Sequence, residues 1–283
     1  MKFGINSMMW ASPFRDAEKL FMRAKSYGAD VFEIACEDLS LLFVDEINKA
    51  KEKVGMDVAT VTGAFGPSRD LSSSDPKIRE SGIAYMKATI DFCEKIGAKV
   101  LAGPAYAATG KARQQTPAEV KIKWDLAVEN LKICGEYADK KKIKIAIEPL
   151  NRFETDFINT VEQGIELINK TNSKAFGFLL DTFHMNIEEN DIAKAIKLAG
   201  TESKIYDFHA CANDRGIPGK DNFDWRKIAD ALKEVEYNDY IIIESFTPEC
   251  KEIAKAASVW RPFAKTKESI AAEGIPFLRK VFS

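Results

Sequence analysis

The stretch IKIAIEPLNRFET, residues 143–155, decides the fold of this chain. It begins as an apolar run and reaches a carboxylate, Glu148, which is followed at once by Pro149. Strands of a parallel sheet are buried on both faces, so they read as short apolar runs, and their carboxyl ends carry the functional groups of α/β barrels. The stretch therefore predicts a buried parallel strand that presents an acid at its tip.

Seven other segments have strand character, and segments with helical spacing alternate with them. The predicted strands span residues 2–9, 31–35, 57–62, 99–103, 143–148, 175–181, 204–209 and 240–244. The predicted helices span residues 14–27, 44–54, 76–96, 117–140, 161–170, 192–198 and 225–235, with two more between 248 and 283. Regular alternation of this kind is typical of a parallel sheet covered by helices.

Local signals mark several helix boundaries. Asp75 and Thr116 each precede a proline, which is the pattern of an N-cap residue followed by proline at the first helical position. Near the other end of the chain, Gly274 and Pro276 fall inside the last segment with helical spacing. Proline lacks a backbone donor and its ring clashes with the preceding turn, so we expect the final helix to break there.

Eight strand–helix units favour closure into a barrel. The chain has 283 residues, and an eight-stranded α/β barrel commonly takes about 250. A doubly wound open sheet is the alternative, but no GxGxxG motif follows the first strand. We therefore predict the α/β class, with residues 1–283 forming a single (β/α)8 TIM barrel domain that has additional C-terminal helices.

Charge and cysteine content exclude several classes of function. The 41 basic and 43 acidic residues are interspersed and give a net charge of −2, so we expect no nucleic-acid partner and no anionic membrane partner. The N-terminal segment reads as a strand rather than a signal peptide. The five cysteines are an odd number without CxxC spacing, which indicates free thiols in a reducing compartment. A cytoplasmic protein is expected.

The last four predicted strands end in the same way. They finish at Glu148, Asp181, His209 and Glu244, and the carboxyl ends of neighbouring barrel strands surround one cavity. Three carboxylates and an imidazole, with no cysteine, suit a hard or borderline divalent ion. We expect Mn²⁺ foremost, with Mg²⁺ or Co²⁺ as alternatives, and no organic cofactor.

Further polar residues follow the same strand ends. Glu154 and Arg152 come after the fifth strand, His184 after the sixth, and Arg215 lies in a glycine- and proline-rich segment after the seventh. His184 and His209 are the only histidines of the chain, and both fall at this end of the predicted barrel. For Arg152 we favour loop solvation or a salt bridge over substrate contact, whereas Arg215 is placed to bind hydroxyl groups.

Four strings in these segments resemble a known family. The strings EPLNRFET, LLDTFHMNIEE, HACANDRGIPG and IIIESF are similar to those of the ketose 3-epimerases that act on D-tagatose, D-psicose (D-allulose) or L-ribulose. That family belongs to the xylose-isomerase-like barrels. The resemblance covers nearly the whole chain, including the segments GPSRDLSSSDPKIR and VWRPFA. It implies an isomerase that inverts C3 of a free ketose.

The resemblance also implies roles for particular residues. Glu148, Asp181, His209 and Glu244 would hold the Mn²⁺-type ion, and Glu148 and Glu244 would act as the acid/base pair. A metal on O2 and O3 of the sugar would stabilise a cis-enediolate, while the two carboxylates exchange a proton on opposite faces. The residues on the family's positions for the O1–O3 end of the sugar are Glu154, His184 and Arg215.

The chain departs from the family pattern near its N-terminus. Some relatives carry aromatic residues where this chain has Asn6-Ser7-Met8-Met9-Trp10, in a region that faces O4 to O6 of the sugar. The departure leaves the preferred ketose open. The candidate walls of this subsite are Asn6, Trp10, Phe65 and Tyr106, and ordinary barrel packing is the alternative for the three aromatic residues.

Other readings of the same sequence differ in reaction rather than in fold. An aldose–ketose isomerase or an inosose dehydratase of the same superfamily would use the same fold and metal, and a non-catalytic sugar-binding barrel would have lost turnover. A barrel nuclease needs several histidines for a multi-zinc cluster, and two cannot supply one. Relatives are dimers or tetramers, so we expect a homodimer or homotetramer. The apolar segment with Val259, Trp260 and Phe263 offers surface for this contact, and covering the last barrel helix is the alternative use for it.

Overall fold

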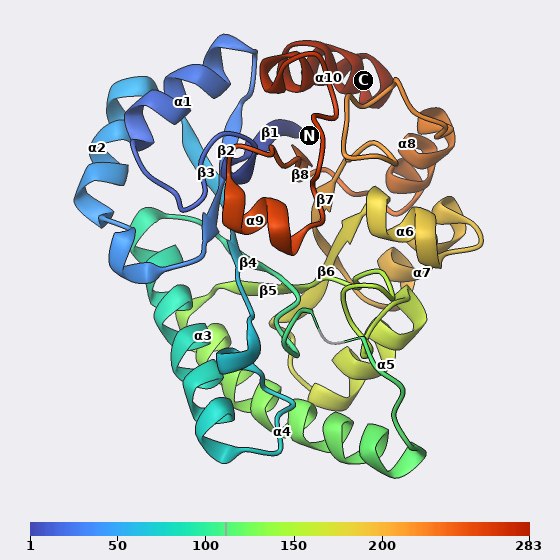
Figure 1. Ribbon diagram of the computed structural model, residues 1–283. Helices are drawn as coiled ribbons and strands as arrows, with labels where there is room; N and C mark the ends of the chain where they lie inside the picture. Colours follow the sequence, from blue (N-terminus) through green and yellow to red (C-terminus); the bar gives the residue numbers. More distant parts are fainter. Residues whose placement is uncertain (111) are drawn as a thin grey trace.

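In the part of the chain described by the computed structural model, residues 1–110 and 112–283, eight parallel strands close into a barrel (Figure 1). Each strand pairs with its neighbours in sequence, and β8 (Tyr240–Ile243) pairs with β1 (Lys2–Asn6) to complete the circle. The predicted TIM barrel is confirmed, and the open doubly wound sheet is excluded.

The elements follow one another as the alternating pattern predicts. The other strands are β2 (Val31–Cys36), β3 (Asp57–Gly63), β4 (Val100–Gly103), β5 (Lys144–Ile147), β6 (Phe176–Asp181) and β7 (Ile205–His209). The helices are α1 (Ala17–Ser26), α2 (Val44–Val54), α3 (Pro76–Ile96), α4 (Pro117–Lys141), α5 (Val161–Thr171), α6 (Thr182–Glu188), α7 (Ile192–Glu202), α8 (Trp225–Glu234), α9 (Lys251–Ala256) and α10 (Lys267–Phe282). Short 3-10 helices cover Ser7–Met9, Leu39–Leu41 and Pro67–Arg69.

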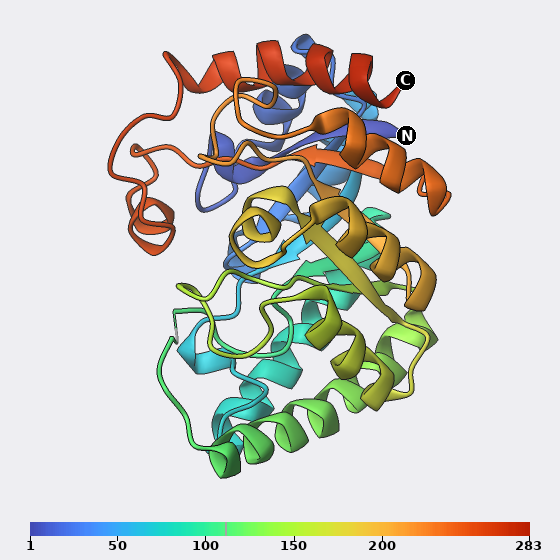
Figure 2. The same ribbon diagram turned by 90° about the vertical axis from the view of Figure 1, so that its right-hand side faces the viewer.

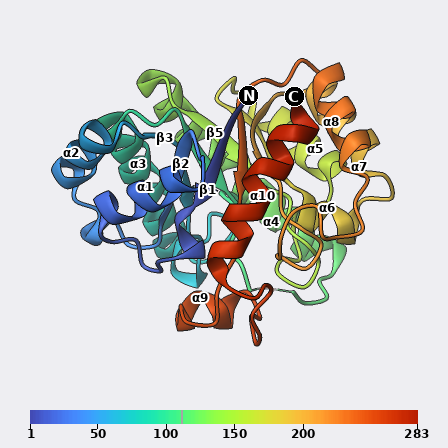
Figure 3. The ribbon, with the colours of Figure 1, turned by 90° about the horizontal axis from the view of Figure 1, so that it is seen from above.

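The helices surround the barrel, and α10 closes the ring. It contacts β1, β8 and α8, and it lies on the side of the barrel opposite α4 (Figure 2). The short helix α9 lies outside this ring, and Figure 3 shows it projecting beyond one end of the barrel. Because α9 follows the carboxyl end of β8, this is the end at which a TIM barrel places its functional groups. The predicted helices after the last strand are thus present.

Strand register brings particular polar residues together inside the barrel. β2 (VFEIAC) is buried along its whole length, and Glu33 lies in its centre. Asn6 pairs with Glu33 between β1 and β2, and Glu33 pairs with Thr60 between β2 and β3. Asp181 pairs with His209 between β6 and β7. Neighbouring strands are about 4.8 Å apart, so paired side chains on one face of the sheet lie within contact distance.

The final helix does not break at Gly274 and Pro276, and the prediction that it would was wrong. α10 runs continuously from Lys267 to Phe282 with Pro276 inside it. Its buried residues include Ile275 and Leu278, and this packing offsets the hydrogen bond that proline removes. A Cβ at Gly274 would lie 2.8 Å from Ile243 Cδ1, so this glycine allows close approach to β8 rather than ending the helix.

Two smaller differences between the predicted and the observed elements concern residues of the site. The first strand ends at Asn6, not at residue 9, because the Asn6 side chain accepts a hydrogen bond from the Met8 backbone and caps a 3-10 helix. A helix that the sequence did not predict, α6, begins directly after β6 with Asp181 as its N-cap. His184 therefore lies on a helix rather than in a loop. No helix among the described residues has the length and apolar character needed to cross a membrane.

Candidate active site

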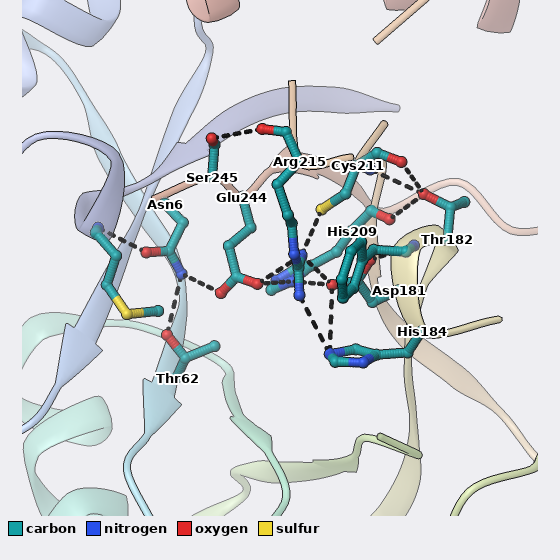
Figure 4. Close-up of polar contacts among 12 residues, drawn as sticks. Asn6, Thr62, Asp181, Thr182, His184, His209, Cys211, Arg215, Glu244 and Ser245 are labelled. Carbon is teal, nitrogen blue, oxygen red and sulfur yellow. Dashed lines mark hydrogen bonds and ion pairs between the residues drawn. The ribbon is translucent and has the colours of Figure 1, made fainter. Parts of the chain in front are cut away.

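Four polar side chains occupy the carboxyl end of the barrel, as the sequence predicted. Glu148 follows β5, Asp181 and His209 end β6 and β7, and Glu244 follows β8. All four are buried, with exposed fractions between 0% and 6%. Nδ1 of His209 lies 3.8 Å from Oδ2 of Asp181 and 3.6 Å from Oε2 of Glu244 (Figure 4).

Arg215 places a cation between two of these carboxylates. Its Nη1 lies 2.5 Å from Oδ2 of Asp181 and 3.0 Å from Oε2 of Glu244 (Figure 4). The guanidinium carbon also lies 4.2 Å from the ring centre of Phe183. The backbone of Arg215 has a left-handed φ of 64°, and the Ser245 hydroxyl donates to its carbonyl at 2.6 Å. The surrounding residues thus hold this arginine in an unfavourable backbone conformation that aims its side chain into the site.

His184 contacts Arg215 and Glu148. The backbone N–H of Asn151 donates to its Nδ1 at 3.2 Å. Nε2 lies 3.6 Å from Oε1 of Glu148 and 3.2 Å from Nη2 of Arg215. Burial lowers the pKa of His184 to about 3, and the charge of Arg215 contributes. His184 is therefore a neutral imidazole.

Glu154 and Tyr106 are arranged around Glu148. The side-chain amide of Asn151 donates to Oε1 of Glu154 at 2.8 Å, and burial raises the pKa of Glu154. The hydroxyl of Tyr106 donates to the carbonyl oxygen of Glu148 at 3.0 Å and to that of Ile158 at 3.2 Å. Tyr106 therefore supports the backbone at the end of β5, which differs from the subsite wall that the sequence suggested.

Of the other three candidate wall residues, Asn6 lies in the site, whereas Trp10 and Phe65 pack against other aromatic side chains. The amide nitrogen of Asn6 lies 3.4 Å from Oε1 of Glu244 and is drawn among the site residues in Figure 4. Trp10 packs against Tyr27 of the α1 region, with ring centres 6.2 Å apart. Phe65 is 1% exposed and packs edge-on against Tyr85. The structure therefore groups Asn6, but not Trp10 or Phe65, with the metal-ligand candidates.

Arg152 forms a salt bridge, which is one of the two roles that we favoured for it over substrate contact. Its Nε lies 2.9 Å from Oε1 of Glu188, and its backbone N–H donates to the same carboxylate at 2.7 Å. These contacts join the segment after β5 to helix α6, and the Arg152 side chain stays 61% exposed.

Two buried carboxylates inside the barrel were not among the predicted site residues. Oε1 of Glu33 lies 3.0 Å from Nε2 of His209, and Oδ2 of Asp207 lies 3.9 Å from the same nitrogen. Asn6 and Thr60 donate hydrogen bonds to Glu33. A carboxylate at this position orients a metal-binding imidazole so that its other nitrogen faces the ion. The signal in the sequence was a single acid within each apolar strand, VFEIAC and IYDFH.

Cys211 also lies among the site residues, next to Arg215, which corrects the expectation of a site without cysteine. Its sulfur is 3.0 Å from Nη1 of Arg215. Cys211 lies two residues beyond the end of β7, where the turn of the chain, rather than strand periodicity, decides the direction of the side chain. Strand-based reasoning therefore missed it. All five cysteines are described, and each is a free thiol as expected.

The residues present fit a divalent cation. Asp181 and Glu244 already hold one positive charge, the Nη1 of Arg215, between their oxygens. Both ring nitrogens of His209 are buried without a hydrogen bond of good geometry to any described residue, although Nδ1 faces these two carboxylates. An imidazole nitrogen and carboxylate oxygens are donors for Mn²⁺, Mg²⁺ and Co²⁺. The donor set therefore suits the expected kind of ion.

The chain matches the model of the xylose isomerase-like TIM barrel family over residues 21–281. It is 35% identical to a protein of Synechocystis sp. named probable ketose 3-epimerase, over 100% of this chain and 97% of that protein. It is 30% identical to L-ribulose 3-epimerase of Mesorhizobium japonicum, over 98% and 93% of the two chains. A solved structure of an L-ribulose 3-epimerase is similar with a TM-score of 0.92 at 28% identity, over 99% and 94% of the two chains.

The chain therefore belongs to the xylose isomerase-like TIM barrel family. Its curated relatives in that family include ketose, D-psicose and L-ribulose 3-epimerases, which are enzymes of the isomerase class. The resemblance and the enzyme class predicted from the sequence are confirmed.

Proposed function

We propose that this protein is a metal-dependent epimerase that inverts C3 of free ketoses. The observation that carries the proposal is the position of Glu148 and Glu244, which flank the cation position made by Asp181 and His209. These two glutamates follow β5 and β8, three strands apart around the barrel, so they reach the cavity from different sides. Inversion of a carbon centre needs two proton carriers on opposite faces of the substrate.

The names of the relatives support a ketose as the substrate. Solved structures at 26% to 27% identity include a D-allulose 3-epimerase in complex with D-allulose and a D-psicose 3-epimerase with D-tagatose. For this chain we propose the same substrate class, namely D-tagatose, D-allulose/D-fructose or L-ribulose.

A divalent ion, Mn²⁺ in our proposal, would be held by Glu148, Asp181, His209 and Glu244 and would supply positive charge for the oxygens of the substrate. When the C3–H bond breaks, its electron pair forms a C2–C3 double bond and the negative charge appears on O2. O3 remains on C3, and with O2 and O3 on the same side of the double bond the intermediate would be a cis-enediolate. One glutamate takes the proton and the other returns one to the opposite face. Burial, and then the charge of Glu244, raise the pKa of Glu148 well above its usual range, which suits a group that must carry a proton.

The remaining polar groups would hold the O1–O3 end of the sugar. His184 would offer Nε2 of its neutral imidazole, Arg215 would offer guanidinium donors, and Glu154 would offer a carboxylate acceptor. The aromatic ring of Phe183 and the buried surroundings exclude water from these contacts, so each hydrogen bond is stronger than it would be at the surface. We propose that the protein assembles as a homodimer or homotetramer.

A panel of free ketoses tests this function. With Mn²⁺ added, we expect interconversion of C3 epimers, abolished by a chelator and restored by Mn²⁺, with the products identified by chromatography. Aldose or dehydrated products would instead indicate the isomerase or inosose dehydratase chemistry of the same superfamily. Ketose binding by calorimetry without any product would indicate a sugar-binding barrel.

A further inference from the structure

The sulfur atom of Cys211 lies next to the guanidinium of Arg215, which is the positive charge at the centre of the site. Nη1 of Arg215 donates toward three acceptor atoms, namely Oδ2 of Asp181 at 2.5 Å, Oε2 of Glu244 at 3.0 Å and Sγ of Cys211 at 3.0 Å (Figure 4). A cation bound by the two carboxylates at this point therefore also lies next to the sulfur.

The spacing of the donor atoms suits a small ion. One donor atom each from Asp181, His209, Cys211 and Glu244 lie within 4.8 Å of one another. Tetrahedral coordination at the usual bond lengths places ligand atoms roughly 3.3–3.8 Å apart. Nδ1 of His209, which is buried and lacks a hydrogen bond to any described residue, is 3.6 to 3.8 Å from the two carboxylates. Small movements would bring all four atoms into one coordination sphere.

The backbone of Cys211 is fixed, so its side chain has a defined direction. Its N–H donates to Oγ1 of Thr182 at 2.9 Å, and the Thr182 hydroxyl donates to the carbonyl oxygen of Cys211 at 2.6 Å (Figure 4). Thr182 is itself fully buried at the start of α6. These two bonds attach the segment after β7 to the end of β6 and aim the sulfur toward Arg215.

Glu148 belongs to a different grouping of donors. Its carboxylate, together with Asp181 and His184, forms another set whose donor atoms lie within 4.8 Å of one another. Asp181 is common to both sets. The two sets therefore share a carboxylate ligand, and only the set with Cys211 contains a sulfur donor.

We propose that Asp181, His209, Cys211 and Glu244 form a second ligand set, which binds a thiophilic divalent ion such as Zn²⁺, Cd²⁺ or Co²⁺ through the sulfur. The proposal rests on the metal centre of the proposed function but concerns a donor set that includes Cys211 instead of Glu148. The Cys211 thiol releases its proton to solvent as the sulfur–metal bond forms, and Arg215 moves off the two carboxylates. Hard ions such as Mg²⁺ gain little from sulfur, so Cys211 discriminates between ions.

Cobalt absorption tests the sulfur ligand without reference to turnover. Chelator-treated full-length protein is titrated with Co²⁺ under anaerobic conditions. We expect a sulfur-to-cobalt charge-transfer band in the near ultraviolet that is lost in Cys211→Ser and Cys211→Ala. Cys134→Ala is the matched control, because Cys134 is also a buried free thiol but lies on α4, and it should keep the band. Cd²⁺ affinity by calorimetry should fall by at least about tenfold in both Cys211 variants.

The outcomes separate this proposal from the proposed function. Co²⁺ binding without the band in the wild-type protein overturns the sulfur ligand and leaves the epimerase proposal standing. Absence of any Co²⁺ or Mn²⁺ binding overturns both. If the Cys211 variants do not fold by circular dichroism, the wild-type and Cys134→Ala spectra still decide, because the band is either present or absent in them.

Discussion

Asp181 and Glu148 are carboxylates at the ends of the neighbouring strands β6 and β5, yet their surroundings move their pKa values in opposite directions. Burial would raise the pKa of Asp181, but the guanidinium of Arg215 and the two histidines outweigh it and hold the pKa well below its usual range. Burial and the charge of Glu244 raise the pKa of Glu148, and its attraction to His209 and Arg215 does not offset them.

This difference divides the site into two parts. Asp181 stays ionised at every working pH, as a permanent metal ligand should, whereas Glu148 can gain and lose a proton, as a catalytic acid/base must. Under the proposed function Asp181 would therefore serve as a metal ligand alone, whereas Glu148 would also carry a proton, and the neighbouring charges account for this difference. Substitutions in the two parts should accordingly have different effects on stability and activity.

Asp181→Asn should have the largest effect. It leaves the buried Arg215 without its nearest carboxylate, and breaking a buried ion pair costs about 3–5 kcal/mol of unfolding free energy. Mn²⁺ binding should be lost as well. Urea unfolding in the presence of chelator and calorimetric titration with Mn²⁺ measure the two effects. Asp125→Asn, in an exposed pair with Lys121, is the control and should leave both unchanged.

Glu148→Gln should instead remove activity without loss of stability. Loss of one proton carrier should lower kcat by about 10²–10⁴-fold. The unfolding midpoint in chelator should stay equal or rise, because the substitution removes a buried carboxylate that lacks full compensation. A variant that lost stability as Asp181→Asn does would contradict the division of the site into two parts.

Glu33→Gln should weaken metal binding by a smaller amount. Glu33 contacts the nitrogen of His209 that faces away from the cation position, and loss of such a partner typically costs about 10–100-fold in metal affinity. The matched control is Asp207→Asn, since Oδ2 of Asp207 is farther from the same nitrogen, at 3.9 Å. Equal Mn²⁺ affinities for Glu33→Gln and wild type would show that Glu33 does not position His209.

His184 should affect stability only in acid. Its pKa is about 3 in the folded protein, against 6.5 as the ordinary value, so below pH 6.5 the unfolded chain binds a proton that the folded chain does not. The free energy of unfolding therefore falls as pH decreases from 6.5 toward 3, by at most about 1.4 kcal/mol per pH unit. His184→Asn should show a shallower decrease over this window in chelator. If the free energy of unfolding fell equally with decreasing pH in the wild type and in His184→Asn, the lowered pKa of His184 would be contradicted.

Much of the fold could be predicted because the signals are local. Apolar runs that end in a polar residue gave the positions of β5 to β8, and an N-cap followed by proline gave the starts of α3 and α4. Helix boundaries that depend on packing between elements could not be predicted from such local signals. Pro276 is tolerated inside α10 because residues around it are buried against the barrel, which no local pattern records.

The site was predictable to the extent that strand ends define it. Glu148, Asp181, His209 and Glu244 each close a strand, so their convergence followed from the barrel. Glu33 and Asp207 lie inside strands, and only the register between strands shows that Glu33 and Asp207 face His209. Cys211 depends on the path of the chain after β7 and on the hydroxyl of Thr182, neither of which a strand pattern contains.

Deuterium incorporation tests the central claim most directly, because it reports which bond is broken. A ketose that the protein turns over is incubated with the Mn²⁺-loaded enzyme in D₂O, the metal is removed, and the recovered sugars are analysed by nuclear magnetic resonance. The proposed function predicts deuterium at C3 of both the recovered ketose and its epimer, and none in the Glu148→Gln reaction. Deuterium at C1 together with an aldose product, or turnover without any deuterium at C3, would contradict it.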